Sequence, residues 1–176
     1  MRLLKTIYPH EVDPTSPEFD YTSFTPRPAA RAIIFNGQKV ALIHVKNDGY
    51  YMLPGGGIDG DEDHPVALAR EVREELGCEI RVGDEIGTIT TFIDRWRNKQ
   101  IDYCYVAFLN GSSLRRQLTD FEAKAGYELV WVPNIDAALK LVRQAKPVAR
   151  DGLLIRERDA TFLESVRICN HVPKRS

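Results

Sequence analysis

Apolar and polar residues alternate, or apolar residues run together, in several short segments of the chain. β-Branched and aromatic residues are frequent in these segments, which favours strands over helices. The predicted strands are LLKTIY (3–8), RAIIF (31–35), KVALIHV (39–45), YYML (50–53), IRVGDEIGTITTFID (80–94), QIDYCYVAFL (100–109) and ELVWVP (128–133). Asn36-Gly37 between the second and third segments predicts a hairpin with a type I′ turn. The proline-rich passage from Pro9 to Pro28 is expected to cross the surface in extended form.

The hydrophobic period lengthens to that of a helix in three places. Residues 63–76 form the first, where Pro65 is tolerated in the opening turn and Gly77 is a natural stop. Residues 134–145 place their apolar side chains on one face, and residues 151–169 read as a C-terminal helix. Strands and helices in this mixture indicate an α/β or α+β layered domain, with a mixed sheet between helices.

The length and composition of the chain indicate a single globular domain but no particular function. The chain has 176 residues, of which 43% are hydrophobic and 28% charged, with a formal net charge of −1, so one soluble domain is expected. The charge balance argues against nucleic acid or an anionic membrane as a partner, and no apolar run approaches membrane-spanning length. The N-terminus lacks the apolar core of a signal peptide. Cys78, Cys104 and Cys169 are odd in number and widely spaced, as in reduced cytoplasmic proteins.

Three glutamates cluster on one side of the predicted helix at 63–76, where an ordinary solvated face would mix both signs of charge. Glu71, Glu74 and Glu75 stand at i, i+3 and i+4, so their side chains fall within an arc of roughly 100°. Like charges on adjacent turns repel each other, and Arg70 and Arg73 relieve this only in part. Mg²⁺ and Mn²⁺ prefer carboxylate and carbonyl oxygens. This pattern therefore predicts a site for a divalent cation.

A glycine-rich turn precedes this helix and completes a known motif. In LPGGGIDGDE (53–62) the backbone can approach a ligand closely and offer a free carbonyl group. From Gly56 to Cys78 the sequence resembles the Nudix box: Gly, five residues, Glu, seven residues, then Arg-Glu-apolar-x-Glu-Glu-x-Gly-apolar. The matching residues are Gly56, Glu62, Arg70, Glu71, Val72, Glu74, Glu75 and Gly77. Cys78 stands where a larger aliphatic residue is more usual. The flanking strands extend the resemblance loosely over about residues 28–145.

The resemblance implies a fold and a chemistry. The fold would be a Nudix-type α/β/α sandwich with a central mixed β-sheet. We expect one domain over residues 1–176, with an N-terminal extension at about 1–28 and a C-terminal helix at about 150–169. The activity would be hydrolysis of a diphosphate linkage in a small nucleoside diphosphate derivative, with Mg²⁺ or Mn²⁺ as the cofactor. Such a reaction needs charge neutralisation on the phosphate oxygens and a positioned water molecule.

The resemblance also assigns roles to single residues. The expected metal ligands are Glu71, Glu74, Glu75 and the carbonyl group of Gly55. Either Glu71 or a glutamate from another loop would orient or deprotonate the water; Asp120, Glu122 and Glu128 are available, and Glu122 is favoured. Arg70 would fix the geometry of a glutamate, with Gly56 and Glu62 as supports.

Candidates for substrate contact lie outside the motif. Lys46 ends a strand just before the glycine-rich turn and is a candidate for phosphate, or simply a solvent-facing strand end. Arg95, Trp96 and Arg97 offer guanidinium groups and a stacking face, or form an ordinary hairpin tip. Tyr50 and Tyr51 precede the glycines on opposite faces of a strand, so one of them, taken as Tyr51, faces the cleft.

The sequence leaves several functions open. A nucleoside triphosphate pyrophosphohydrolase is the leading interpretation. Cleavage of ADP-ribose or a nucleotide sugar is the alternative, although Ile93 and Asp94 stand where ADP-ribose enzymes commonly have a proline. Removal of a 5′ pyrophosphate from RNA is disfavoured by the absence of a basic bias. A nucleotide-sensing domain without turnover is disfavoured because the motif is complete. The expected partner is a small nucleotide, and the protein would be a monomer or homodimer.

Overall fold

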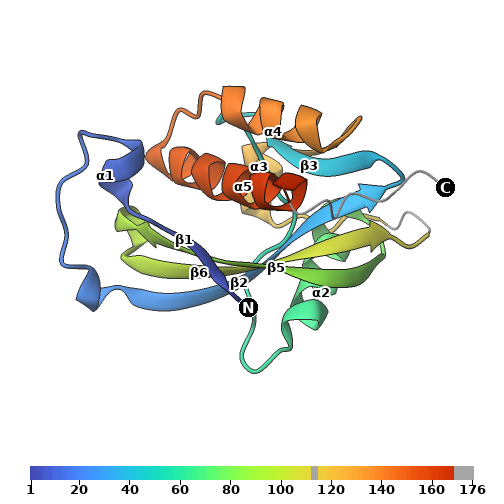
Figure 1. Ribbon diagram of the computed structural model, residues 1–176, viewed down its shortest axis with the longest axis horizontal. Coiled ribbons are helices and arrows are strands. Elements are labelled where there is room, and N and C mark those ends of the chain that lie inside the picture. Colours follow the sequence, from blue (N-terminus) through green and yellow to red (C-terminus); the bar gives the residue numbers. More distant parts are fainter. Residues whose placement is uncertain (112–114, 169–176) are drawn as a thin grey trace.

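The strands of the chain form a single mixed sheet with helices on both faces (Figure 1). The computed structural model describes residues 1–111 and 115–168. The strands are β1 (Leu3–Ile7), β2 (Thr25–Asn36), β3 (Lys39–Val45), β4 (Tyr50–Met52), β5 (Ile80–Ile93), β6 (Asn98–Leu109) and β7 (Tyr127–Val132). The helices are α1 (Pro9–Val12), α2 (His64–Leu76), α3 (Asp120–Ala125), α4 (Ile135–Gln144) and α5 (Arg150–Ile168), with short turns η1 (Tyr21–Ser23) and η2 (Asp94–Trp96). Cys169 lies outside the described residues.

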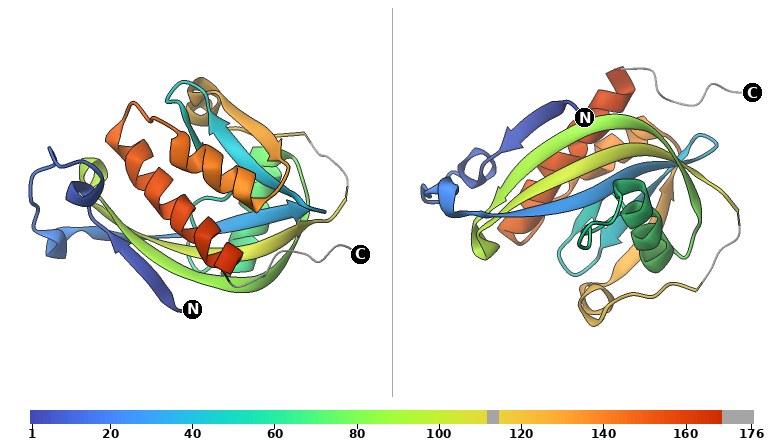
Figure 2. Two further views of the ribbon diagram at one scale, coloured as in Figure 1. Left: turned by 45° about the horizontal axis from the view of Figure 1, so that its top comes forward. Right: turned by 90° about the horizontal axis from the view of Figure 1, so that it is seen from below.

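The sheet has the order β1-β5-β6-β2-β3-β4, and β7 adds to β3. The pairs β1–β5 and β2–β6 are parallel, and the other pairs are antiparallel. Helix α2 covers one face, while α4 and α5 cover the other (Figure 2). The α/β/α sandwich with a central mixed sheet that the sequence predicts is therefore confirmed.

Alternation along the central strands divides the core into two layers. On β2, Ile33 and Phe35 face α4 and α5, whereas Ala32 and Ile34 face α2. All four are at most 1% exposed. A fully buried side chain of the size of Ile or Phe contributes roughly 1.5–3 kcal/mol. The period-2 pattern thus fixes which face of β2 meets each helical layer.

The glycine-rich segment lies against β2 because β2 and β3 separate below their hairpin. The two strands pair only at Phe35–Val40 and Asn36–Lys39. Residues 54–58 run beside the free edge of β2, where Ala30 and Ala32 donate their N–H groups to backbone carbonyls at 2.9 and 3.0 Å. This places the segment between the sheet and α2.

Three details differ from the sequence prediction. Residues 25–30 belong to β2 and do not cross the surface as an extended segment. Pro26 and Pro28 are tolerated there because the even-numbered residues of β2 turn their backbone groups away from β6, so no hydrogen bond between the two strands is lost. The hairpin turn has a positive φ at Gly37 alone, 60°, which matches a type II′ turn and not type I′. Helices α1 and α3 were not predicted. Within the described residues, no helix has the length and apolar character needed to cross a bilayer.

Candidate active site

Helix α2 directs its last glutamate at the glycine-rich segment. Glu75 is 3% exposed, and its Oε2 accepts a hydrogen bond from the N–H of Gly55 at 2.8 Å. Burial raises the pKa of Glu75 to about 8; the Gly55 N–H and the charge of Arg31 oppose this rise, and the charges of Glu71 and Glu122 add to it. Glu75 is therefore a buried carboxyl group with too little positive charge around it.

Arg70 ties the helix to the loop that precedes it. Its Nη1 donates to Glu71 at 2.7 Å, and its Nη2 donates to Glu62 at 2.9 Å and to the carbonyl of Gly57 at 3.0 Å. The hydrogen bond from Arg70 lowers the pKa of Glu62, whereas burial raises the pKa of Glu71. The guanidinium fork holds both glutamates against the glycine-rich segment.

Two glycines permit this close approach. Gly55 has a φ of 121°, and a methyl group at its Cα would overlap the carbonyl oxygen of Ala30. A methyl group on Gly56 would overlap the carboxylate of Glu71. The segment can thus lie between β2 and the glutamates only because these residues have no side chain.

Two further acids lie around this centre. The side chain of Glu74 is 41% exposed and stands 3.6 Å from Arg70, so it is accessible from solvent. Glu122 forms a capping box at the start of α3, accepting the N–H of Thr119 at 2.8 Å, and its charge is close enough to raise the pKa of Glu75. The structure therefore gathers the acids of the motif and brings Glu122 near them.

The donor set suits a hard divalent cation. Three glutamates and the carbonyl of Gly55 supply only oxygen atoms, which Mg²⁺ and Mn²⁺ prefer. Among residues 1–111 and 115–168, no three Asp, Glu, His or Cys side chains already surround a single point. Arginines and the Gly55 N–H hold the carboxylates instead. The residues therefore fit the cation by chemistry.

Candidates for substrate contact divide into two groups. Lys46 forms an ion pair of 2.9 Å with Glu128, and its backbone N–H bonds to Gly126 at the end of α3, so both charges lie beside α3. Tyr51 is half-buried and stacks on His44 with ring centroids 4.4 Å apart.

The second group lies on the turn between β5 and β6, at the end of the sheet nearest α1 (Figure 1). Arg95 stands 4.9 Å over the ring of Trp96 and 3.8 Å from Asp151 of α5, and Arg97 stands 5.2 Å over the ring of Phe24. Trp96 is 61% exposed. These contacts join the turn to α5 and to the N-terminal segment, and none of them involves the glutamates of α2.

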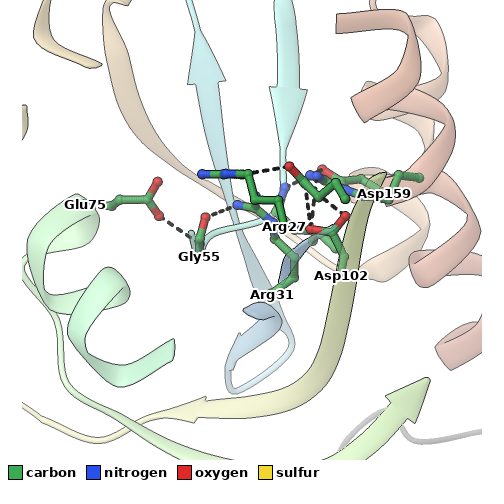
Figure 3. A network of polar contacts seen from close by, with 9 residues as sticks. Arg27, Arg31, Gly55, Glu75, Asp102 and Asp159 are labelled. Atoms are coloured by element: carbon green, nitrogen blue, oxygen red, sulfur yellow. Dashed lines mark hydrogen bonds and ion pairs between the residues drawn. The ribbon is translucent and has the colours of Figure 1, made fainter. Parts of the chain in front are cut away.

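A set of buried charges that the sequence analysis did not single out also reaches the site. Arg31 is 8% exposed; its Nε donates to Asp102 at 3.0 Å, and its Nη1 donates to the carbonyl of Gly55 (Figure 3). Arg31 begins the predicted strand RAIIF, and Asp102 lies within the predicted strand QIDYCYVAFL. These two opposite charges in otherwise largely apolar segments were the available signal.

Comparison with known proteins identifies the family. The family model described as the NUDIX domain matches residues 25–152, which include β2, the glycine-rich segment and all of α2. The chain belongs to the Nudix family. The Nudix motif read from Gly56 to Cys78 lies inside the matched region.

Individual relatives resemble this Nudix chain to different extents. An 8-oxo-(d)GTP phosphatase of Mycolicibacterium smegmatis is 33% identical over 101 residues, which is 57% of this chain and 29% of that protein. The chain thus spans less than a third of the length of this curated relative. A Nudix hydrolase of Nitrosomonas europaea superposes with a TM-score of 0.62 at 17% identity, over 85% of this chain and 93% of the other. An ADP-ribose pyrophosphatase of Streptococcus suis superposes with a TM-score of 0.53 at 22% identity, over 81% and 93%. The two structural likenesses concern the Nudix fold alone.

Proposed function

We propose that this protein is a Mg²⁺-dependent pyrophosphohydrolase that acts on a small nucleotide, with a nucleoside triphosphate as the substrate. One observation carries the proposal: every acidic position of the Nudix motif is filled, and Glu71 and Glu75 lie against the glycine-rich segment at Gly56 and Gly55. Glu75 is buried there with a pKa of about 8. A protein that only needed a stable helix would gain nothing from burying a carboxyl group in this way.

The chemistry follows from the donor set. When bound, Mg²⁺ would neutralise charge on the phosphate oxygens and on the leaving group. Glu71, Glu74, Glu75 and the Gly55 carbonyl would hold it. Arg70 keeps Glu71 in place through its 2.7 Å hydrogen bond. Glu71 or Glu122 would orient the attacking water and accept its proton.

The choice of substrate rests on a relative and not on the geometry of the site. The M. smegmatis relative is named for a nucleoside triphosphate substrate, and at 33% identity it supports that class. An ADP-ribose or nucleotide-sugar pyrophosphatase is the alternative. A small nucleotide is the proposed partner in either case, and the proposed compartment is the cytoplasm.

The test is product release from a panel of nucleoside triphosphates, ADP-ribose and nucleotide sugars, with and without Mg²⁺. We expect Mg²⁺-dependent turnover that is highest with a triphosphate. Glu74→Gln should lose at least about a hundredfold in kcat/KM, since even residues that only support metal ligands cost 10–100-fold. Glu79→Gln is the matched control, because Glu79 follows the same helix and its side chain pairs with Arg73 at 3.9 Å, away from the glycine-rich segment.

Two results would change the conclusion. Tight nucleotide binding without metal-dependent turnover would replace the enzyme by a nucleotide-sensing domain. A preference for ADP-ribose over all triphosphates would keep the enzyme and replace its substrate.

A further inference from the structure

Buried ion pairs connect the C-terminal helix to the glycine-rich segment (Figure 3). Asp102 and Asp159 are 0% exposed, Arg158 is 2% exposed and Arg31 is 8% exposed. They come from β2, β6 and α5, and their two positive and two negative charges balance. We call these four residues the arginine–aspartate network.

Hydrogen bonds hold the network together internally. Asp102 accepts from Arg31 at 3.0 Å and from Arg158 at 3.3 Å, and the side-chain amide of Gln100 donates to both its oxygens at 3.0 Å. Asp159 accepts from Arg158 at 2.7 and 3.2 Å. Burial by itself would raise the pKa of Asp102, but the charges of Arg158 and Arg31 outweigh it and lower that pKa. Asp102 is thus ionised, and hydrogen bonds within the network satisfy both aspartates.

The network contacts the glycine-rich segment at two points. Asp159 accepts the backbone N–H of Leu53 at 2.8 Å, and Arg31 donates to the carbonyl of Gly55. On the opposite side, Glu75 accepts the N–H of Gly55. Both polar backbone groups of Gly55 are therefore held, one by the helix that carries the glutamates and the other by the network.

Stability alone is a poor explanation for this arrangement. Replacing a buried ion-pair network by apolar residues of similar volume is often neutral or stabilising, because the charges must be desolvated. Here the outward contacts of the network go to backbone groups of the segment that carries Gly55. A fixed backbone orientation is what these contacts supply.

We propose that Asp159 and Arg31 are positioning residues, which act from outside the motif to fix the Leu53–Gly55 backbone and, through Gly55, the carboxylate of Glu75. Helix α5 thereby becomes part of the catalytic apparatus without touching the substrate. The consequence for turnover rests on the function proposed above, whereas the consequence for the backbone does not.

The test uses two variants and one matched control. In Asp159→Asn the charge is lost and an NH2 group replaces one of the two acceptor oxygens, so a donor now faces the N–H of either Leu53 or Arg158. Arg31→Lys keeps the charge but loses the fork that spans Asp102 and Gly55. Glu157→Gln is the control: it lies on the same helix and loses a carboxylate paired with Lys5 at 2.8 Å and Arg143 at 2.6 Å, with no contact to the glycine-rich segment.

Three quantities are measured on each folded variant: amide hydrogen exchange at Leu53 and Gly55, kcat and KM with the preferred nucleotide, and Tm. In both network variants we expect exchange at these two amides to be about tenfold faster or more, relative to the control. We expect kcat to fall about 10–100-fold, as for other residues that orient metal ligands, with KM within about twofold.

The outcomes separate the two proposals. If the network variants match Glu157→Gln in amide exchange and in kcat, the positioning role is wrong. If kcat falls only in proportion to Tm and exchange at Leu53 and Gly55 is unchanged, the role is also wrong, since the effect is global. If the wild type hydrolyses no nucleotide but the two amides exchange faster in both variants, the positioning of the backbone stands and the proposed function fails.

Discussion

Two buried carboxyl groups on either side of Arg31 behave in opposite ways. Glu75 is 3% exposed and Asp102 is 0% exposed, and the charge of Arg31 lowers the pKa of each. Burial nevertheless prevails at Glu75 and raises its pKa to about 8, while the charges of Arg158 and Arg31 prevail at Asp102 and lower its pKa. Equal burial therefore does not mean an equal charge state.

The difference lies in the partners of each group. Asp102 has two guanidinium groups and an amide around it. Within the part of the chain that the structure describes, the carboxyl group of Glu75 accepts one hydrogen bond, from the backbone N–H of Gly55, and its acidic neighbours Glu71 and Glu122 make its ionisation harder. Arginines of the protein neutralise the carboxylate of Asp102. Ionised Glu75 has too little positive charge nearby, and a cation from solution would supply it.

The largest expected change in the free energy of unfolding comes from neutralising Asp102, whose charge is balanced by two arginines. Asp102→Asn leaves Arg31 and Arg158 with half of their buried counter-charge, and breaking a buried pair typically costs about 3–5 kcal/mol. Urea unfolding at neutral pH should show this loss in the free energy of unfolding. A loss no larger than that of the exposed-pair variant Lys46→Ala, which should stay within about 1 kcal/mol, would contradict the comparison.

Neutralising Glu75 should instead increase the free energy of unfolding. With its folded pKa raised above 4.5 to about 8, Glu75 costs stability as pH rises through that interval, because the unfolded chain releases the proton first. Glu75→Gln removes this cost and keeps an acceptor for the Gly55 N–H. In EDTA at about pH 9, the variant should be about 1–3 kcal/mol more stable in urea than the wild type, although inactive. If the wild type and Glu75→Gln were equally stable from about pH 5 to pH 9, ionised Glu75 would have enough positive charge around it, which contradicts the comparison.

The smallest effect should appear in acid. Because the folded pKa of Asp102 lies below its ordinary value of 3.8, its contribution is complete above that value and is lost as pH falls through the folded pKa. Wild type and Asp102→Asn should therefore converge in stability between about pH 4 and pH 2. Parallel stability curves over this range would mean that folding leaves the pKa of Asp102 unchanged.

The fold could largely be predicted because its signals are local. The apolar run of β3, the β-branched residues of β5, the helical period of α2 and the glycine after α2 are each recognised from neighbouring residues only. The motif was found for the same reason, since its spacing is that of one loop and one helix. The start of β2 was missed because its two prolines argue against a strand. They are tolerated only on the side of β2 that faces away from β6, and that side is known only once the path of the glycine-rich segment is known.

The arginine–aspartate network shows what local signals cannot provide. Arg31 and Asp102 are 71 residues apart, and Leu53 and Asp159 are 106 residues apart. A charge inside an apolar strand indicates that some partner exists, but naming the partner requires the order of the strands and the helix that covers them. The placement of Arg95 and Trp96 beside α5 was hidden in the same way, because the path of a hairpin tip depends on the surfaces it meets.

The central claim, that the surroundings of Glu75 are completed by a divalent cation, is tested most directly by the effect of Mg²⁺ on Tm without any nucleotide. At a Mg²⁺ concentration about 100-fold above its Kd, the Tm of the wild type should rise by roughly 5–10 °C. Glu157→Gln should show the same rise, and Glu75→Gln should show almost none. No rise in the wild type, or a full rise in Glu75→Gln, would contradict the claim.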